Sequence, residues 1–188
     1  MSEEEVVRKF LERLEGLGWR RASECPPEGE VVTSPILDRV FEESFRKLNG
    51  KALVNEGLGD KVDSVLGKVK DMVIKSEPYE FLEYLRDGLF VQEGRKTIHV
   101  ILIDYEDINK NEFIACRNVT FPGEVKPNKP DVVLYINGIP ILVIEAKDPF
   151  RLGERAISEG YNQLLRYERE YPDLFKYCLL YTSDAADE

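Results

Sequence analysis

The sequence predicts an α/β protein in which a mixed, mostly antiparallel central sheet is flanked by helices and preceded by a helical region. In residues 1–90 the apolar side chains recur three or four positions apart, which is the period of an amphipathic helix. From residue 91 to residue 177 they form short β-branched runs of strand length, followed by one more helical stretch. We expect residues 1–177 to form a single domain, because this length suits one domain and no repeat or linker interrupts it.

Four helices are expected in the first half of the chain, over residues 3–17, Ile36–Leu48, Val62–Ile74 and Glu80–Asp87. Ser2 and Glu5 have the spacing of a capping box at the start of the first helix. Asn49-Gly50 is expected to end the second helix, and Gly88 to end the fourth.

Extended structure is expected over Thr97–Tyr105, Glu112–Phe121, Val132–Ile136, Ile139–Ile144 and Leu174–Leu180. The third and fourth runs join at Asn137-Gly138, a dipeptide typical of hairpin turns. Both runs are apolar at nearly every position, which predicts central strands that are covered on both faces. A helix is expected from about Gly153 to Tyr171, with Ile157, Tyr161 and Leu164 in the core.

Composition limits the class of protein. Apolar residues make up 43% and charged residues 33% of the chain, which is typical of a soluble globular protein. No run approaches the roughly 18 apolar residues that span a membrane, and the acidic start lacks the features of a signal peptide. Cys25, Cys116 and Cys178 are odd in number and widely spaced, so we expect a cytoplasmic protein with neither a disulfide framework nor a zinc cluster. The net charge of −10 argues against nonspecific nucleic-acid binding by the whole surface.

The last eleven residues, 178–188, differ in composition from the rest of the chain. Their string, CLLYTSDAADE, resembles one reading-frame translation of the transposon adaptor used to prepare sequencing libraries. We therefore expect a non-native tail, with the natural protein continuing beyond residue 177; the alternative is a natural acidic tail. The segment holds three acids and no Lys or Arg, so without it the net charge is −7 rather than −10.

Three charged residues bracket the predicted hairpin. Asp131 precedes its first strand, and Glu145 and Lys147 end its second strand. Residues two apart in a strand point to the same face, so Glu145 and Lys147 are expected side by side. Charges at the end of so apolar a strand are costly to bury unless they are paired or hold a metal. The pattern indicates a divalent-metal site that cleaves phosphodiester bonds.

The turn decides whether Asp131 joins this pair. A two-residue turn at Asn137-Gly138 directs Asp131 to the face opposite Glu145. A three-residue loop, with a left-handed Gly138 in a bulge, restores the parity and places Asp131 opposite Val143. We therefore expect that bulge, or an irregular backbone at Asp131.

With that parity, Asp131 and Glu145 would supply carboxylate oxygens to Mg²⁺, and the backbone carbonyl of Ala146 would be a third ligand. Lys147 would orient or deprotonate the attacking water, while the metal polarises the phosphoryl oxygen. The alternative is a surface ion pair between Glu145 and Lys147 at the strand end, which contributes little to stability. Local spacing alone does not decide between these interpretations.

The segment PDVVLYINGIPILVIEAK resembles the PD-(D/E)xK nuclease core near the N-terminus of the restriction (R) subunit of type I restriction–modification enzymes. Further likeness follows in order along most of the chain, at Leu48-Asn49, Tyr84–Gly88, Val100–Tyr105 and Asn111–Phe113. The resemblance implies a restriction-endonuclease-like fold and the catalytic trio Asp131, Glu145 and Lys147. The motif position between Glu145 and Lys147, here Ala146, tolerates different side chains, because only its backbone carbonyl takes part in the site.

A second motif of that family, Q-x-x-x-Y, is matched by Gln163 and Tyr167. A spacing of four places both side chains on one helical face, where they could hold a phosphate or orient Lys147. Their alternative role is a polar stripe beside the core, and the resemblance favours the functional one.

The resemblance also implies partners: double-stranded DNA, and methylation and specificity subunits. In the family the restriction subunit continues into an ATP-driven DNA translocase, whereas this chain has no G-x-x-x-x-G-K-[ST] loop, so we expect it not to bind ATP. A local basic face made of Lys126, Lys129, Lys147, Arg151, Arg155 and Arg166 would suffice for DNA contact. The alternatives are a repair or recombination nuclease on the same core, or a non-catalytic docking module.

Four other residues are given structural roles. His99 is expected in the core or on a sheet face, Trp19 as a packing anchor and Cys116 in the core. Glu5 could add a third acid to the site, but a helix cap is the favoured role.

Overall fold

The structure is a computed structural model, and it describes residues 2–148, 155–178 and 180–185. The chain divides into two compact units: unit 1 comprises Met1–Leu37 and Phe113–Glu188, and unit 2 comprises Asp38–Glu112. Unit 2 is thus an insertion within the sequence of unit 1. The predicted α/β class is confirmed. The assignment of residues 1–177 to one nuclease domain stays a prediction.

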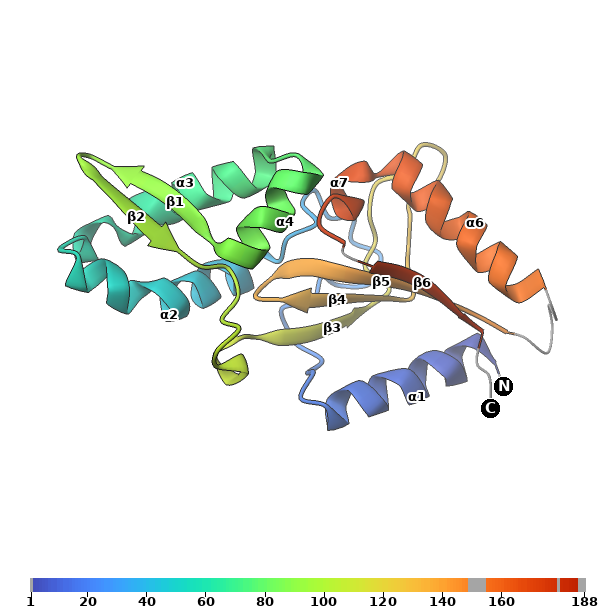
Figure 1. Cartoon of the computed structure of the whole chain (residues 1–188). Helices are drawn as coiled ribbons and strands as arrows, with labels where there is room; N and C mark the ends of the chain where they lie inside the picture. The colour runs from blue at the N-terminus through green and yellow to red at the C-terminus, as the bar shows by residue number, and fades with distance from the viewer. Residues whose placement is uncertain (1, 149–154, 179, 186–188) are drawn as a thin grey trace. The chain divides into compact units, whose positions relative to one another are not determined.

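Unit 1 consists of α1 (Glu3–Gly16), β3 (Phe113–Arg117), β4 (Val132–Ile136), β5 (Ile139–Lys147), α6 (Arg155–Glu170), α7 (Pro172–Phe175) and β6 (Leu180–Ala185). The sheet has the order β3-β4-β5-β6, antiparallel among the first three strands and parallel between the last two. Figure 1 shows α1 and α6 on opposite faces of this sheet. A mixed, mostly antiparallel sheet flanked by helices is the restriction-endonuclease-like core that was predicted.

The predicted strand Leu174–Leu180 is wrong at every described residue except its last, Leu180. Leu174 lies in α7, where Pro172 occupies the first turn, and the strand begins only at Leu180. The strand β6 falls within the segment expected to be non-native, and that origin stays a prediction.

The capping box of α1 is confirmed. The Glu5 N–H donates to Ser2 Oγ at 3.3 Å and the Ser2 N–H donates to Glu5 Oε2 at 3.0 Å, so Glu5 is a cap. The helix packs on one face of the sheet through a core made of Val6, Val7, Leu11, Leu14, Ala115, Val132, Leu134, Ile144 and Ala146. Trp19 is partly buried against this core and meets the Phe113 ring edge-on at 5.2 Å. Because Ile144 and Ala146 belong to this core, α1 holds the C-terminal end of β5 in place.

The helix α6 packs on the other face with a phase that differs from the prediction. Leu164 is buried as expected, but Ile157 is 60% and Tyr161 51% exposed. The small residues Ala156 and Gly160 face the sheet instead. Short side chains at these positions set the buried face one residue away from the expected one.

The segment that follows α1 runs along the outer edge of β3. Arg20 forms a parallel bridge with Ile114, and a disulfide joins Cys25 to Cys116, which is fully buried. The expectation of no disulfide is therefore wrong, while the core position of Cys116 is confirmed. The two cysteines are 91 residues apart, so their spacing gave no indication that the fold brings them together.

Unit 2 consists of α2 (Asp38–Asn55), α3 (Val62–Lys75), α4 (Pro78–Asp87), β1 (Leu89–Glu93), β2 (Lys96–Val100) and two 3₁₀ helices, Gly59–Lys61 and Ile108–Lys110. The strands β1 and β2 form their own antiparallel sheet. The predicted strand Thr97–Tyr105 is thus shorter than expected and does not belong to the central sheet.

The helix α2 does not end at Asn49-Gly50, as was predicted. The Asn49 amide is buried and bonds to distant backbone, donating to Ile101 O at 2.9 Å and accepting from the Ile101 N–H at 2.9 Å. The same Nδ2 also donates to Phe45 O, one helical turn earlier, at 3.1 Å, so the amide bonds to the helix as well as to Ile101, and the helix runs on to Asn55.

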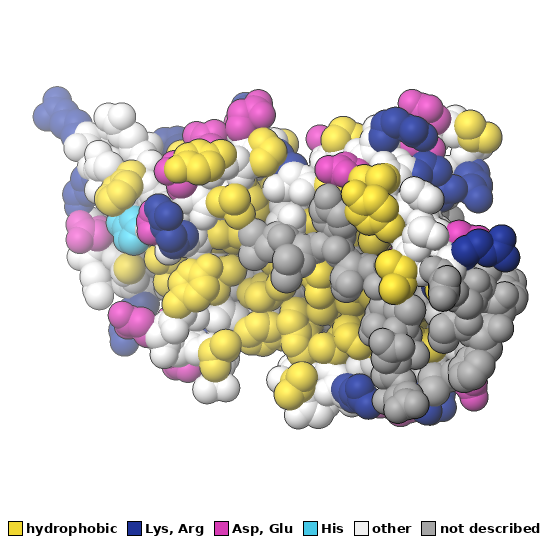
Figure 2. All heavy atoms as spheres, turned by 45° about the vertical axis from the view of Figure 1, so that its right-hand side comes forward, with side chains coloured by type: hydrophobic (Ala, Val, Ile, Leu, Met, Phe, Trp, Pro, Cys, Tyr) yellow, Lys and Arg dark blue, Asp and Glu magenta, His cyan; other side chains and the backbone are white. Residues whose placement is uncertain are grey.

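His99 is exposed on β2, where its cyan side chain is visible in Figure 2. One ring nitrogen lies 2.6 Å from Asp87 O, and the ring lies 4.9 Å from that of Phe90. The sheet-face role is confirmed. Within the described parts of the chain, every helix is too short or too polar to cross a membrane.

Candidate active site

The β4–β5 hairpin has a two-residue turn. Ile136 pairs with Ile139, and both turn residues are left-handed, with φ of 52° at Asn137 and 80° at Gly138. The predicted three-residue loop with its bulge at Gly138 is therefore wrong. Left-handed conformation at both positions matches the right-handed twist of the flanking strands.

The extra residue lies within β5 instead. Tyr135 pairs with Pro140, but the next pair is Leu134 with Leu142, so Ile141 is left over as a bulge. Proline has no N–H to donate to the ladder, and in strands it is found at edges and bulges. Pro140 therefore marks where the register shifts.

The bulge brings the acids to one face. Val133 pairs with Val143, and Asp131 and Glu145 lie two residues beyond this pair on the same side of the sheet. Asp131 Oδ2 accepts the Ala146 N–H at 2.7 Å, which fixes its carboxylate against β5. The parity that the site requires is present, although Asp131 lies opposite Glu145 rather than Val143.

Glu145 and Lys147 form a buried ion pair. Lys147 Nζ donates to Glu145 Oε1 at 2.6 Å, and the side chains are 11% and 4% exposed, respectively. Burial raises the pKa of Glu145 to about 7; the Asp131 charge adds to this rise and Lys147 opposes it. Burial also raises the pKa of Asp131, against the opposing effect of its bond to the Ala146 N–H.

A divalent cation fits these groups. Glu145 Oε2 is buried and has no hydrogen-bond partner among the described residues, which is costly for a carboxylate oxygen. Ala146 directs its N–H toward β4, and in an antiparallel pair the carbonyl of the same residue points to the same neighbour. No group of three or more His, Cys, Asp or Glu side chains within the described ranges could hold a metal. An ion would therefore rest on two carboxylates, one carbonyl and water, a set that suits Mg²⁺.

Gln163 and Tyr167 share one face of α6, as predicted. Gln163 Nε2 donates to the Tyr167 hydroxyl, which donates to Lys129 O at 3.3 Å. Burial raises the pKa of Tyr167 to about 12, and the Glu145 charge adds to this rise. The pair thus lies near the carboxylates, where its hydrogen bonds hold the Lys129 backbone rather than Lys147.

Sequence reasoning considered Glu5 and missed Glu3. The Asp148 N–H donates to Glu3 Oε1 at 3.3 Å, and, after burial, the Glu3 charge is among the causes that raise the pKa of Asp131 and Glu145. The helical period of α1 could have identified Glu3 as a residue near the site. Glu3 lies three and four positions before Val6 and Val7, so it shares their sheet-facing side.

The predicted basic face is partly engaged in ion pairs. Lys126 and Arg155 are exposed, whereas Lys129 Nζ lies 2.6 Å from Glu28 Oε1. Arg166 lies 3.9 Å from Glu170 and stacks over the Tyr167 ring at 5.0 Å. Arg151 lies outside the described residues.

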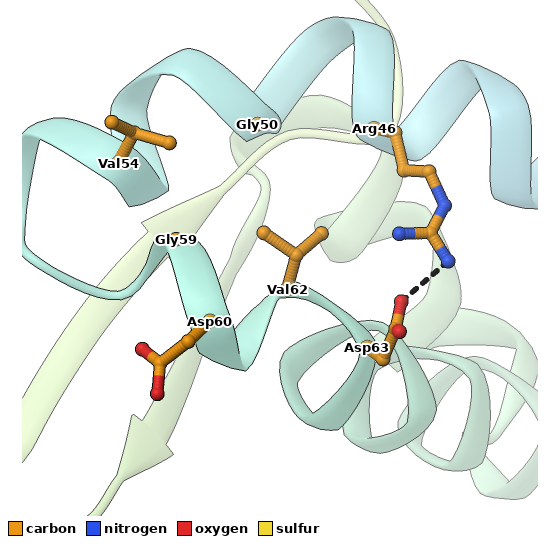
Figure 3. Close-up of a pocket in the computed structure, with 7 residues that line it drawn as sticks. All are labelled: Arg46, Gly50, Val54, Gly59, Asp60, Val62 and Asp63. Atoms are coloured by element: carbon orange, nitrogen blue, oxygen red, sulfur yellow. Dashed lines mark ion pairs between the residues drawn. The ribbon is translucent and has the colours of Figure 1, made fainter.

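Unit 2 contains pockets of a different kind. The one in Figure 3 is lined by Arg46, Gly50, Val54, Gly59, Asp60, Val62 and Asp63. Its charged groups are already paired in part, because Arg46 and Asp63 form an ion pair of 2.5 Å. The acid pair with a neighbouring lysine in unit 1 is the stronger candidate for chemistry.

Comparison with known proteins gives one consistent result. The family model described as "Type I restriction enzyme R protein N terminus" matches residues 1–186, which includes most of the segment expected to be non-native. The MjaVIIIP endonuclease subunit of a type I restriction enzyme from Methanocaldococcus jannaschii is 34% identical over 178 residues, covering 92% of this chain and 16% of that protein. The HindI endonuclease subunit from Haemophilus influenzae is 29% identical, covering 94% and 18%. The chain therefore spans less than a fifth of the length of these relatives.

Proposed function

Because this chain belongs to the family of the type I restriction enzyme R protein N terminus, we propose that its site hydrolyses phosphodiester bonds of double-stranded DNA with Mg²⁺. The family match and the relatives identify it as the N-terminal domain of a type I restriction enzyme endonuclease subunit. The proposal adds the metal, the substrate and the catalytic residues to that identification.

The observation that carries the proposal is the half-satisfied carboxylate of Glu145. One oxygen accepts a hydrogen bond from Lys147, and the other is buried without a partner on the face that Asp131 shares. An unmet buried acceptor is costly, so a further group that binds this oxygen would stabilise the site. A divalent cation held between Glu145 and Asp131 would supply that partner.

Each residue then has a role. Asp131, Glu145 and the Ala146 carbonyl would hold Mg²⁺, which when bound polarises the phosphoryl oxygen and favours the hydroxide form of water. Lys147 is held by Glu145 where its ammonium group would orient the attacking water and offset charge on the phosphate.

Gln163 and Tyr167 act as positioning residues in this proposal. The Tyr167 hydroxyl bonds to the carbonyl of Lys129, two residues before Asp131, and Gln163 orients that hydroxyl. Together they fix where the chain turns into β4 and hence where the Asp131 carboxylate lies.

The full-length protein would add further activities. Since this chain covers less than a fifth of its relatives, we propose that an ATP-dependent DNA translocase follows it, and that methylation and specificity subunits complete a cytoplasmic restriction complex.

The test combines metal binding with cleavage. Mn²⁺ and Mg²⁺ are titrated into the wild type, Asp131→Asn, Glu145→Gln and the control Glu30→Gln by calorimetry, and supercoiled plasmid is assayed for nicking. Glu30 is exposed, so its variant matches the charge change of the other two. We expect the site variants to bind metal at least about tenfold more weakly and to lose nicking, while the control behaves as wild type. Equal metal affinity in wild type and Glu145→Gln contradicts the proposal. Binding to DNA without metal-dependent nicking supports a docking module.

A further inference from the structure

The carboxylate of Glu28 lies against two groups that flank the start of β4. Lys129 Nζ is 2.6 Å from Glu28 Oε1, and Lys129, with a smaller effect of the Asn118 side chain, lowers the pKa of this carboxylate. The Lys129 and Glu28 side chains are 42% and 65% exposed, so this ion pair is open to solvent. Lys129 itself is two residues before Asp131 in the sequence.

Arg117 adds a third polar group at the same place. It ends β3 opposite Val132, and the next residue, Asn118, donates its N–H to Asp131 O at 3.2 Å. The Arg117 charge acts on both Glu28 and Asp131. Its Nε is buried without a hydrogen-bond partner in the described structure, so at least one donor of this guanidinium is unsatisfied.

The Glu28 carboxylate is held there by a rigid support. Glu28 occupies a corner of the turn Pro27–Glu30, which is closed by a 3.1 Å backbone hydrogen bond and has Gly29 at a φ of 86°. Three residues earlier, Cys25 is bonded to Cys116, the neighbour of Arg117. A tight turn and a covalent tie together fix an anionic group beside Lys129 at little entropic cost.

We propose that Lys129, Arg117 and Asn118 form a subsite for a phosphate of DNA beside the metal site, and that the Glu28 carboxylate occupies it until the substrate displaces it. The inference rests on the proposed function, because it names the nuclease substrate as the ligand. A phosphodiester offers two oxygens that share a negative charge in place of the Glu28 carboxylate, and guanidinium and ammonium groups are the usual phosphate partners.

The occupied subsite also bears on the net charge of −10. An acidic protein repels DNA, and a carboxylate placed on a phosphate-binding lysine adds to that repulsion locally. The competing explanation is an ordinary exposed ion pair without function, which contributes little to stability. The two explanations differ in what removing Glu28 does to DNA affinity.

The experiment measures binding of a fluorescent 20-base-pair duplex to the whole 188-residue chain in EDTA, by anisotropy, as salt is varied. Glu28→Gln is compared with Glu30→Gln, an exposed acid of the same turn that gives the same change in net charge. We expect Glu28→Gln to bind about fivefold more tightly, and Glu30→Gln to stay within about twofold of wild type. The salt slope of Glu28→Gln should be steeper by about 0.9, because one more phosphate contact is made without displacing an internal anion.

A double-substitution cycle assigns the effect to the subsite. In a Lys129→Gln background, replacing Glu28 should give no more than the Glu30 control, because the donor that it blocked is gone. Equal affinities for Glu28→Gln and Glu30→Gln, or a gain that persists without Lys129, overturns the proposal, as does a duplex that binds to none of the variants. Because the assay contains no metal, a failed nicking assay with these binding results intact rejects the nuclease chemistry and leaves the subsite standing.

Discussion

Lys147 Nζ binds one oxygen of Glu145, at 2.6 Å, and leaves the other oxygen of the same carboxylate buried and unpartnered. The pair is therefore neither a surface salt bridge nor a fully satisfied buried one. A buried pair of this kind contributes little to stability by itself, and removing Lys147 is costly because the carboxylate charge is then left in a poor environment. The stability of the metal-free protein should report on it directly.

The first prediction concerns pH. The folded-state pKa of Glu145, about 7, lies above its ordinary value of 4.5. The stabilisation associated with this group is complete below the unfolded-state pKa and is lost as pH rises through 7. Glu145→Gln mimics the protonated form at every pH. We expect it to match wild type near pH 5 and to exceed it by up to about 3 kcal/mol near pH 8, measured by urea unfolding in EDTA.

The control for this prediction is Glu30→Gln, whose difference from wild type should not vary with pH. A stability difference between Glu145→Gln and wild type that is constant from pH 5 to pH 8 contradicts the raised pKa. Saturating Mg²⁺ should reverse the order at pH 8, since it stabilises only the protein that retains the carboxylate.

The second prediction concerns Lys147→Met. The substitution keeps the buried stem and removes the charge that faces Glu145, so an uncompensated carboxylate stays buried. We expect a loss of about 3–5 kcal/mol in the free energy of unfolding at pH 8, and a smaller loss at pH 5.5. Adding Glu145→Gln to this variant should recover at least half of the loss. The exposed Lys126→Met serves as the control and should change stability by less than about 0.5 kcal/mol.

The third prediction concerns the disulfide. Its two cysteines are 91 residues apart, and between them lies the whole of unit 2. In the chain-entropy model a loop of this size stabilises the fold by about 4–5 kcal/mol. We expect reductant, or Cys25→Ser, to lower the melting temperature. Cys178→Ser should keep the response to reductant, because Cys178 is a free cysteine.

A thiol count completes this test. The three cysteines should give one reactive thiol in the unfolded, unreduced chain and three after reduction. Three thiols before reduction would rule out the bond.

The fourth prediction concerns the hairpin turn. Gly138 has a φ of 80°, which side chains adopt only with strain, so Gly138→Ala should cost about 1–2 kcal/mol. Gly16→Ala is the matched control, because Gly16 lies in α1 and a Cβ there meets no atom within 4 Å. It should be neutral or stabilising by up to about 1 kcal/mol. Equal effects of the two substitutions in urea unfolding would contradict the left-handed turn.

Elements fixed by local pattern were predictable. The Ser2–Glu5 capping box, the apolar strands β4 and β5 and the helix that carries Gln163 all stand where the sequence placed them. The misplaced end of α2 has a tertiary cause, because Asn49 exchanges hydrogen bonds with a residue 52 positions away. Periodicity carries no information about such a partner.

The site was predictable as a set of residues and less so as geometry. Counting residues along the hairpin shows that one extra residue is needed to bring Asp131 to the same face as Glu145. The count does not say at which position that bulge lies. The structure places it at Ile141, after the proline that cannot donate to the ladder. Glu28 and Arg117 were not predicted, because only the fold brings Glu28 to Lys129 and Arg117 to Val132, the neighbour of Asp131. The catalytic roles themselves stay predictions.

The two points where unit 2 joins unit 1 lie at one end of the central sheet. The Leu37 N–H donates to Gly138 O at 2.9 Å, and Phe113 pairs with Ile136, so both points adjoin the β4–β5 turn, whereas Asp131 and Lys147 lie at the far ends of the same strands. The chain therefore leaves and re-enters unit 1 at the end of the sheet that is opposite the carboxylates. A fluorescent or affinity module spliced in at either point would therefore enter the chain at the sheet end away from Asp131 and Lys147.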